Sequence, residues 1–359
     1  MRQLCGTYAA PMQRALGQVF DPRQNALNAW RLVLAAGVIL QHSWPLTGRD
    51  FATPFVQLFT QVWVDGFFVV SGFLIVGSWL NNPRLREYAA ARALRIFPGL
   101  WVCVVIVAFV LAPIGVAMSE GSLRLSSQIA YVLNNAVLNI FYFGIDGTPM
   151  GVPWPGVWDG PLWTLIFELL CYIGVAVLGV VGLLRRRWTI PVVFVLAVAG
   201  AAVVGYPVMA VETIPQMLLR FIVVFSAGAL GYQFRDRIPA RWWLVAVCAG
   251  LVVALGLLPN YRVFAALPLA YAVIVSGALL KRPRLRNDLS YGMYIYAWPV
   301  QQLLAAAGLV WLDPRLFFVV ATVCTVPLAA GSWFVVERQA MKLKRRVRSR
   351  EFAESAPGG

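Results

Sequence analysis

The chain contains few of the residues from which most soluble active sites are built. Only 13% of its 359 residues are charged, acidic residues number 15 against 30 Lys and Arg, and His42 is the single histidine. The five cysteines are scattered without a Cys-x-x-Cys pair, so neither a disulfide framework nor a thiolate site is indicated. One histidine and no clustered thiols argue against a catalytic zinc, and we predict no metal site. No P-loop or dinucleotide-binding fingerprint is present.

Apolar residues, in contrast, make up 60% of the chain, and the mean hydropathy is +0.73. Long apolar runs recur from end to end and are separated by short charged clusters, which is typical of a polytopic helical membrane protein. We therefore predict an all-α fold of about ten transmembrane helices, each near the ~20 residues that a bilayer requires. The predicted spans are residues 28–46, 60–80, 98–117, 161–184, 190–207, 214–234, 242–258, 263–280, 289–311 and 316–336.

The basic residues predict the orientation of these spans. Cytoplasmic connections of membrane proteins carry an excess of Lys and Arg. With the N-terminus in the cytoplasm, every cytoplasmic connection is basic, whereas the outer connections hold only Arg49, Arg124, Arg262 and Arg315. Ten spans then place the C-terminus in the cytoplasm as well. The formal charge of +15 is explained by this topology and by attraction to anionic lipid headgroups, so we predict no nucleic-acid partner.

Three regions follow from this topology. We predict a cytoplasmic N-terminal segment over residues 1–27, a transmembrane domain over 28–337 and a basic cytoplasmic tail over 338–359. Because a polar stretch precedes the first span, we do not expect that span to be a cleaved signal peptide. The stretch 125–143 mixes apolar and amide residues, which favours an interfacial or re-entrant helix over a spanning one.

His42 is the first candidate for chemistry. It lies inside the first predicted span, eleven residues after Arg31, so both side chains share one helix face roughly 16 Å apart. Polar groups at membrane depth are costly and usually mark function. A neutral imidazole can accept or donate a proton near pH 7, as a general base requires. The alternative is a histidine that only satisfies the hydrogen bond of a neighbour.

Two carboxylates lie at a similar predicted depth. Glu168 is placed roughly 10 Å below the outer edge of the bilayer, nearly level with His42. Asp65 lies near the outer end of the second span. We predict that Glu168 orients His42 as a base and that Asp65 supports the site. The alternative for Glu168 is an interhelical hydrogen bond or a structural pair with Arg220.

A second candidate site, composed of arginines, is predicted on the cytoplasmic side of the membrane. Arg92 and Arg95 are three residues apart on a short basic helix before the third span, and Arg31 is at the inner end of the first. Forked guanidinium groups bind phosphates well, so these three predict a phosphate clamp. Anchoring by the positive-inside rule explains any single one of these arginines better than a ligand does. The spacing to His42 favours a phosphorylated carrier whose extended thioester arm reaches the histidine.

Three tryptophans close the longest outer connection. Trp154, Trp158 and Trp163 cluster on the predicted outer side of the membrane. Flat indole faces pack against sugar rings, and the indole N–H binds hydroxyls, so we predict that they contact a carbohydrate. The alternative is an ordinary interfacial belt of aromatic residues.

Six segments stand in order along the chain: RLVLAAGVILQH (Arg31 to His42), VDGFFVVSGFLI (with Asp65, Ser71 and Gly72), RALR (Arg92 and Arg95), LWTLIFELLCY (with Trp163 and Glu168), LSYGMYIYAWPV and FVVERQ. Through these segments the chain resembles integral-membrane acyltransferase family 3 from about residue 25 to 340. Each motif is loose by itself, but their order on this topology is specific. The chain departs from the family at Ala297, where many members have histidine, which leaves His42 as the candidate base.

The resemblance implies a membrane O-acyltransferase of a bacterial inner (plasma) membrane. The acyl group, most often acetyl, comes from cytoplasmic acetyl-CoA or another acyl-CoA, which is a donor substrate and not a permanently bound cofactor. The acceptor is a hydroxyl of an extracytoplasmic glycan or glycosylated molecule. The protein either completes the transfer within the bilayer or passes the group to a separate extracytoplasmic partner.

Roles for the candidate residues follow from this resemblance. Arg31, Arg92 and Arg95 are expected to hold the CoA phosphates or to guide the pantetheine arm. His42 would deprotonate the acceptor hydroxyl or transiently carry the acyl group, with Glu168 holding its ring. Asp65 would support the site or bind the acceptor.

A proton-coupled transporter or lipid-carrier flippase is the main alternative. Buried Arg, His and Glu in a ten-span protein would serve such a carrier equally well. The ionisable residues, however, are concentrated in the first half of the chain, which favours an enzyme. A sensor that keeps the acyltransferase architecture without activity is a third possibility, and the intact Arg–His spacing argues against it.

Overall fold

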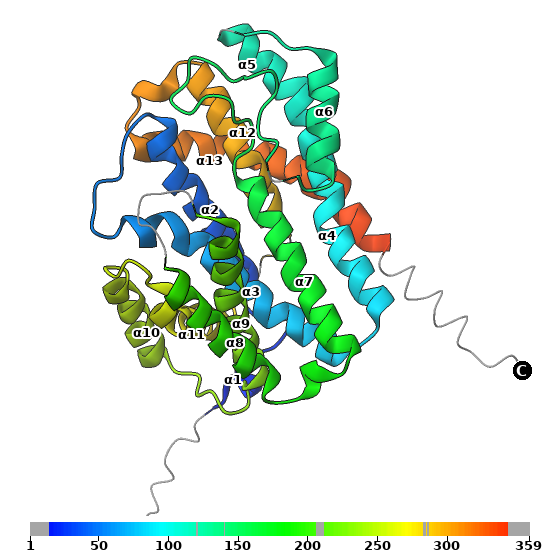
Figure 1. Cartoon of the computed structure of the whole chain (residues 1–359), viewed down its shortest axis with the longest axis vertical. Coiled ribbons are helices and arrows are strands. Elements are labelled where there is room, and N and C mark those ends of the chain that lie inside the picture. Colours follow the sequence, from blue (N-terminus) through cyan, green and yellow to red (C-terminus); the bar gives the residue numbers. More distant parts are fainter. Residues whose placement is uncertain are drawn as a thin grey trace, which may run out of the picture.

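The computed structural model describes residues 14–119, 121–139, 141–205, 212–282, 285 and 287–343 (Figure 1). Throughout this part of the chain the structure is helical, without a β-strand, which confirms the predicted all-α class. The helices are α1 (Leu16–Val19), α2 (Leu27–Leu46), α3 (Val56–Asn81), α4 (Leu85–Ile106), η1 (Val107–Leu111), α5 (Ala112–Met118), α6 (Leu125–Ala136), η2 (Pro161–Trp163), α7 (Thr164–Val180), η3 (Leu183–Arg185), α8 (Thr189–Val204), α9 (Ile214–Gln233), α10 (Trp242–Leu255), α11 (Arg262–Leu279), α12 (Ser290–Ala306), η4 (Leu309–Trp311), α13 (Pro314–Gly331) and η5 (Ser332–Glu337).

The pair α3 and α9 forms the most extensive helix contact of the bundle. Two glycines permit this contact, because a Cβ atom on Gly72 would lie 1.9 Å from the carbonyl oxygen of Phe225, and one on Gly228 would lie 2.0 Å from that of Val69. Small residues at a helix interface let backbones approach closely, which is a main source of packing between membrane helices. A side chain at either glycine would therefore separate the two helices.

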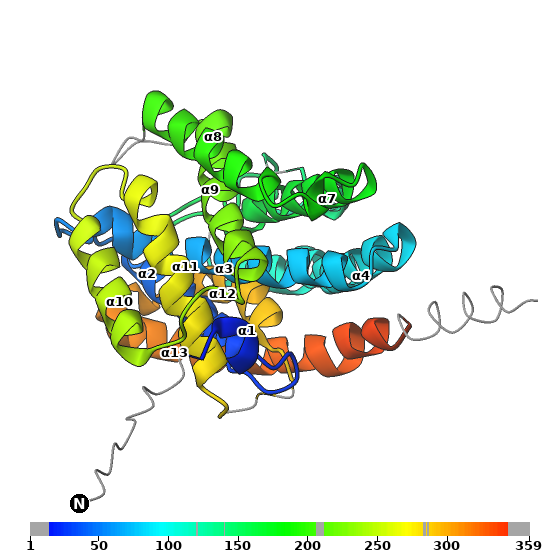
Figure 2. The same cartoon turned by 90° about the horizontal axis from the view of Figure 1, so that it is seen from below.

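Helix α2, which carries Arg31 and His42, packs against α3, α11, α12 and α13 (Figure 2). Its partner α12 is buried over nearly its whole length, from Ser290 to Gln302. Polar side chains on α2 and α12 therefore face other helices. This packing places the candidate histidine in the interior of the bundle.

Six helical segments of the described chain are long and apolar enough to cross a membrane. They are Val56–Asn81, Leu85–Met118, Pro161–Val180, Ile214–Gln233, Arg262–Leu279 and Pro314–Leu343. The apolar helices α8 and α10 are shorter, at 16 and 14 residues. Each of the ten predicted spans coincides with a helix, but the number ten and the orientation of the termini stay predictions. The stretch 125–143 contains α6, whose 12 residues are too few to span a bilayer.

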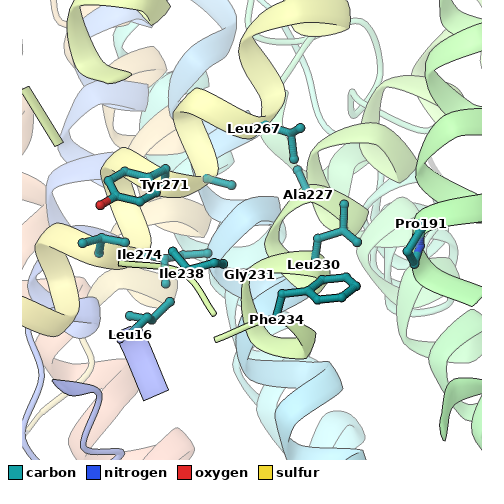
Figure 3. A pocket seen from close by; sticks show the side chains of 12 residues that line it. Leu16, Pro191, Ala227, Leu230, Gly231, Phe234, Ile238, Leu267, Tyr271 and Ile274 are labelled. Atoms are coloured by element: carbon teal, nitrogen blue, oxygen red, sulfur yellow. The ribbon is translucent and has the colours of Figure 1, made fainter. Parts of the chain in front are cut away.

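An apolar cavity of about 390 Å³ lies between α1, α8, α9 and α11 (Figure 3). Its lining includes Ala227, Leu230, Leu267 and Ile274. None of the predicted site residues, all of which lie in the described chain, contributes to this lining. The cavity is therefore separate from the candidate site.

Candidate functional site

The ring of His42 is held by one neighbour on its own helix and one on α12. Its Nε2 atom lies 3.2 Å from Nε2 of Gln41, and the centroid of its ring lies 4.8 Å from that of Trp298 in an edge-to-face arrangement. The other ring nitrogen, Nδ1, is buried and has no hydrogen-bond partner among the described residues. A buried polar atom without a partner is costly, and in a native structure it calls for an explanation such as a ligand or a catalytic role.

Glu168 lies on α7, faces α3 and forms no hydrogen bond with His42 in the described structure. Its Oε1 atom accepts hydrogen bonds from the hydroxyl of Ser71, at 3.1 Å, and from the hydroxyl of Tyr172. Within the described chain these are its hydrogen-bond partners. The carboxylate that we predicted to orient His42 therefore forms an interhelical hydrogen bond instead, which is one of the alternatives considered from the sequence.

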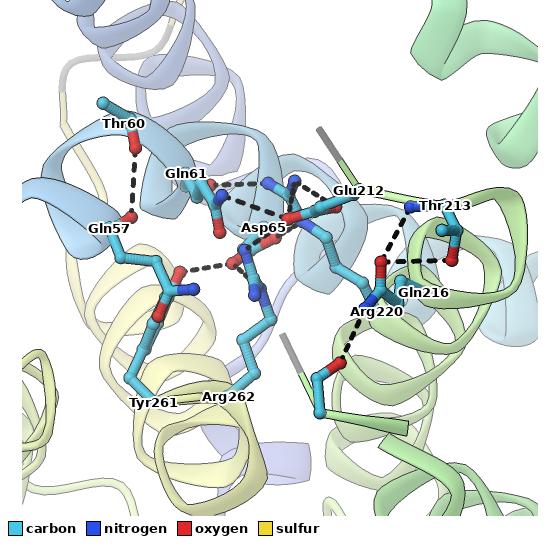
Figure 4. Close-up of polar contacts among 11 residues, drawn as sticks. Gln57, Thr60, Gln61, Asp65, Glu212, Thr213, Gln216, Arg220, Tyr261 and Arg262 are labelled. Carbon is cyan, nitrogen blue, oxygen red and sulfur yellow. Dashed lines mark hydrogen bonds and ion pairs between the residues drawn. The ribbon is translucent and has the colours of Figure 1, made fainter. Parts of the chain in front are cut away.

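Asp65 belongs to a buried charge cluster (Figure 4). Its Oδ1 atom accepts a hydrogen bond from Nε of Arg220, at 2.8 Å. Its Oδ2 atom accepts one from Nε of Arg262, also at 2.8 Å, and one from the hydroxyl of Tyr261. Glu212 lies 3.3 Å from Arg220 and 3.8 Å from Arg262. Two carboxylates thus balance two guanidinium groups, and the cluster joins α3, α9 and α11.

This cluster changes the expectation for two residues. Asp65 was expected to support the acceptor site, but both of its oxygens are engaged in ion pairs that hold helices together. Arg262 was counted among the outer basic residues, yet its side chain is 1% exposed at the first turn of α11. The sequence signal for this network was weak, because its members are up to 197 residues apart.

Arg31 and Arg95 meet at one carboxylate oxygen. Nη1 of Arg31 lies 2.5 Å from Oδ2 of Asp288, and Nη2 of Arg95 lies 2.7 Å from the same atom. Arg95 also approaches Glu337 at 3.5 Å. Burial opposes ionisation of Asp288, but the charges of Arg31 and Arg95 outweigh it and hold its pKa at about 2. The structure thus brings two of the three predicted arginines together, through an acid that the sequence analysis missed.

Arg92 differs from the other two arginines. Its guanidinium lies over the rings of Tyr88 and Tyr172, 5.8 Å from each centroid, and its Nε atom is buried without a hydrogen-bond partner. Among the described residues no carboxylate pairs with it. Arg92 lies three residues before Arg95 on α4, and Arg95 shares Asp288 with Arg31, so the three arginines converge near one end of α2 and α4. Of the three arginines, Arg92 is the one that no acidic side chain of the described residues neutralises.

The three predicted tryptophans have different surroundings. Trp158 is fully buried, and its indole N–H donates to the hydroxyl of Thr148 at 2.9 Å, so it is part of the core. Trp163 is half-buried and packs against Phe167 and Phe221. Of the three, only Trp154 is exposed, at 44%.

Trp154 is also the tryptophan that connects to the histidine. Its ring centroid lies 5.6 Å from that of Trp298, which in turn contacts His42. The Nε2 atom of Gln302 donates to the backbone carbonyl oxygens of Trp154 and Val157, at 2.7 Å each. The loop that presents Trp154 is thereby attached to α12. Trp298 and Gln302 were not singled out from the sequence, although both lie in or next to the segment LSYGMYIYAWPV.

A bundle of apolar helices with charged and polar groups buried inside it has the character of a polytopic membrane protein. The family model described as an acyltransferase domain, acyltransferase 3, matches residues 24–334, so the chain belongs to this family. It is therefore an acyltransferase.

Two curated proteins are similar over almost their whole length. Nodulation protein 10 of Rhizobium leguminosarum bv. viciae is 30% identical over 92% of this chain and 96% of its own. An O-acetyl transferase of Shigella phage Sf6 is 27% identical over 88% of this chain and 96% of its own. No solved structure matches the chain significantly.

Proposed function

We propose that this acyltransferase moves an acyl group, most often acetyl, from cytoplasmic acyl-CoA to a hydroxyl of an extracytoplasmic glycan. One observation carries the proposal. Nδ1 of His42 on helix α2 is buried and has no hydrogen-bond partner among the described residues, and Arg31, eleven residues earlier, belongs to a cluster of three arginines. Eleven residues span about 16 Å of helix, a distance that an extended pantetheine arm can bridge between a bound nucleotide and a reacting thioester.

On the donor side, the arginines supply positive charge for the phosphates of CoA. Arg31 and Arg95 are held in place by Asp288, whereas Arg92 is stacked between two tyrosine rings. Guanidinium groups bind phosphate oxygens in forked geometry. Arg92 is the group that binds a phosphate without first giving up a carboxylate partner.

A substitution of Arg92 tests this role. In Arg92→Gln we expect KM for acetyl-CoA to rise about 10- to 100-fold, because a hydrogen bond to a charged group contributes about 1.5–3 kcal/mol. Thermal stability should change little, since no described carboxylate loses its partner. Arg86→Gln is the matched control, an exposed arginine on the same helix. Equal KM values for both variants would contradict the assignment.

On the acceptor side, His42 accepts the proton of the acceptor hydroxyl. The hydroxyl oxygen attacks the thioester carbonyl carbon, the new C–O bond forms, the C–S bond breaks, and the imidazolium returns the proton to the departing thiolate. A base placed in this way typically contributes 10²–10⁴-fold in rate. The exposed face of Trp154, with Trp298 behind it, would pack against a sugar ring beside this histidine.

The proposal is tested in proteoliposomes that contain the purified protein. Acetyl-CoA is supplied on one side and a panel of glycans on the other, and release of free thiol is followed. Thiol release that depends on a glycan, together with a glycan mass increased by one acetyl group, is the expected result. Transport of an intact substrate without thiol release would favour the carrier instead.

A further inference from the structure

We propose that the apolar cavity between α1, α8, α9 and α11 binds an acyl chain of an anionic phospholipid such as phosphatidylglycerol, whose headgroup lies on the arginines at one end of the cavity (Figure 3). None of the residues assigned to acyl transfer lines this cavity. The proposal therefore goes beyond the proposed function, and each can fail without the other.

The cavity has the lining and the length of a site for a hydrocarbon chain. Its side chains are apolar apart from the hydroxyl of Tyr271, which already donates to the backbone carbonyl oxygen of Pro239 at 2.5 Å. Along α11 the lining extends from Leu267 to Val275, which is about 12 Å of helix. One leaflet supplies about half of the ~30 Å hydrocarbon core of a bilayer, so the cavity follows an acyl chain through most of a leaflet. Apolar cavities stay dry and take up apolar ligands.

The cavity opens on an apolar surface of the bundle. Leu267, one of its lining residues, is 47% exposed, and α8 and α11 both pack on α9. The side chains exposed on these flanking helices are also apolar, among them Leu196 on α8 and Phe264 on α11. Because α11 is long and apolar enough to cross a membrane, the molecules that meet this opening are the acyl chains of lipids.

Six arginines surround the end of the cavity where α9 meets the connections to α8 and α10. The segments 185–187 and 235–241 contain Arg185, Arg186, Arg187, Arg235, Arg237 and Arg241 against one acid, Asp236. Gln233 joins the two segments, because its Nε2 atom donates to the backbone carbonyl oxygen of Arg186 at 3.3 Å. Ile238, in the second segment, lines the cavity. The ion pairs of the described residues involve other arginines, so the positive charge of these six is available to an anion.

Tryptophans place this basic end at the level of the lipid headgroups. Trp188 directly precedes α8, Trp242 and Trp243 begin α10, and each of the three is more than half exposed. Tryptophan is enriched where a membrane meets water. Basic pockets between membrane helices at this level bind anionic headgroups. An apolar cavity that ends in arginines at the interface therefore complements both parts of an anionic phospholipid.

Photo-crosslinking tests where the lipid lies. The full chain is reconstituted in phosphatidylcholine vesicles that contain a phosphatidylglycerol with a diazirine at the end of one acyl chain. We expect crosslinks in the middle of α9 and α11, around Ala227 and Leu267, and competition by unlabelled phosphatidylglycerol but not by added phosphatidylcholine. Crosslinks spread evenly over the exposed apolar helices, or equal competition by both lipids, would overturn the proposal.

Filling the cavity should remove the lipid. Ala270 lines the cavity and is buried, so the ring of Ala270→Phe occupies the space of the acyl chain. We expect loss of the phosphatidylglycerol that native mass spectrometry detects on the wild-type protein after extraction from the same vesicles. Ala246→Phe, at an exposed alanine on α10 outside the lining, is the matched control and should retain it.

A charge variant keeps the test valid if Ala270→Phe does not fold. Arg186 and Arg237 are exposed, so Arg186→Gln combined with Arg237→Gln leaves the packing intact. Each arginine near a headgroup contributes about fivefold in affinity, and the double variant should bind phosphatidylglycerol roughly 25-fold more weakly. Arg86→Gln with Arg315→Gln removes two exposed arginines elsewhere and should match the wild type. Wild-type binding by the Arg186 and Arg237 variant would overturn the proposal, whatever the outcome of the acetyl-transfer assay.

Discussion

Replacement of His42 by alanine is expected to reduce acyl transfer by about 10²–10⁴-fold, the usual contribution of a general base. His42 is the only histidine of the chain, so no second imidazole takes its place. The measurement is the single-turnover rate of acetyl transfer in proteoliposomes at saturating acetyl-CoA.

Measuring how tightly the His42→Ala variant binds acetyl-CoA distinguishes loss of the base from misfolding. The arginine cluster lies at the other end of α2, so KM or Kd for acetyl-CoA should remain near the wild-type value in His42→Ala. Thermal unfolding in detergent should show one cooperative transition close to that of the wild type, because the half-buried ring makes few polar contacts. Wild-type turnover in this variant would refute the role of His42.

The second large effect is expected on stability and not on chemistry. Asp65→Asn should destabilise the protein by about 3–5 kcal/mol, as expected when one partner of a buried ion pair is removed. Asp65 is fully buried and accepts from both Arg220 and Arg262, so its neutralisation removes the negative charge that is paired with both guanidinium groups. The measurement is the free energy of unfolding, or the shift in Tm, in a fixed detergent.

A double variant provides the control for this prediction. In Asp65→Leu combined with Arg220→Met, the loss should be smaller than the sum of the two single losses, because residues in one network are coupled. A stable Asp65→Asn variant that has lost acetyl transfer would instead support the catalytic role expected from the sequence.

The positions of the helices were predictable because apolar runs of about 20 residues report burial in lipid or in a protein core. The polar helices α2 and α12 were harder to classify. Both carry amides and other polar side chains, and these face neighbouring helices, so their average hydropathy understates how completely they are enclosed. Whether α2 and α12 count as membrane spans therefore depends on how they pack in the bundle as well as on their composition.

Depth was a poor guide to which side chains meet. Distance along a helix axis places His42 and Glu168 at similar levels, but it does not say how each helix is rotated or which neighbour it faces. Rotation of α7 directs Glu168 to Ser71 and Tyr172. The same limit applies to the tryptophans of the outer connection. Trp154 and Trp158 are four residues apart in similar sequence surroundings, so the sequence did not predict that Trp158 is buried and Trp154 exposed.

By itself, the sequence determined the membrane character of the protein, its helical class, and the spacing of Arg31 and His42 on one helix, because all three depend on local composition and on the regular rise of a helix. The tertiary structure alone decided which groups are neutralised and which remain free. Asp65, Arg31 and Arg95 are engaged in ion pairs with residues far away in the chain, whereas in the part of the chain that the structure describes Arg92 has no ion-pair partner and Nδ1 of His42 has no hydrogen-bond partner. The energy of a buried charge depends on its neighbours in space, and long-range packing selects those neighbours.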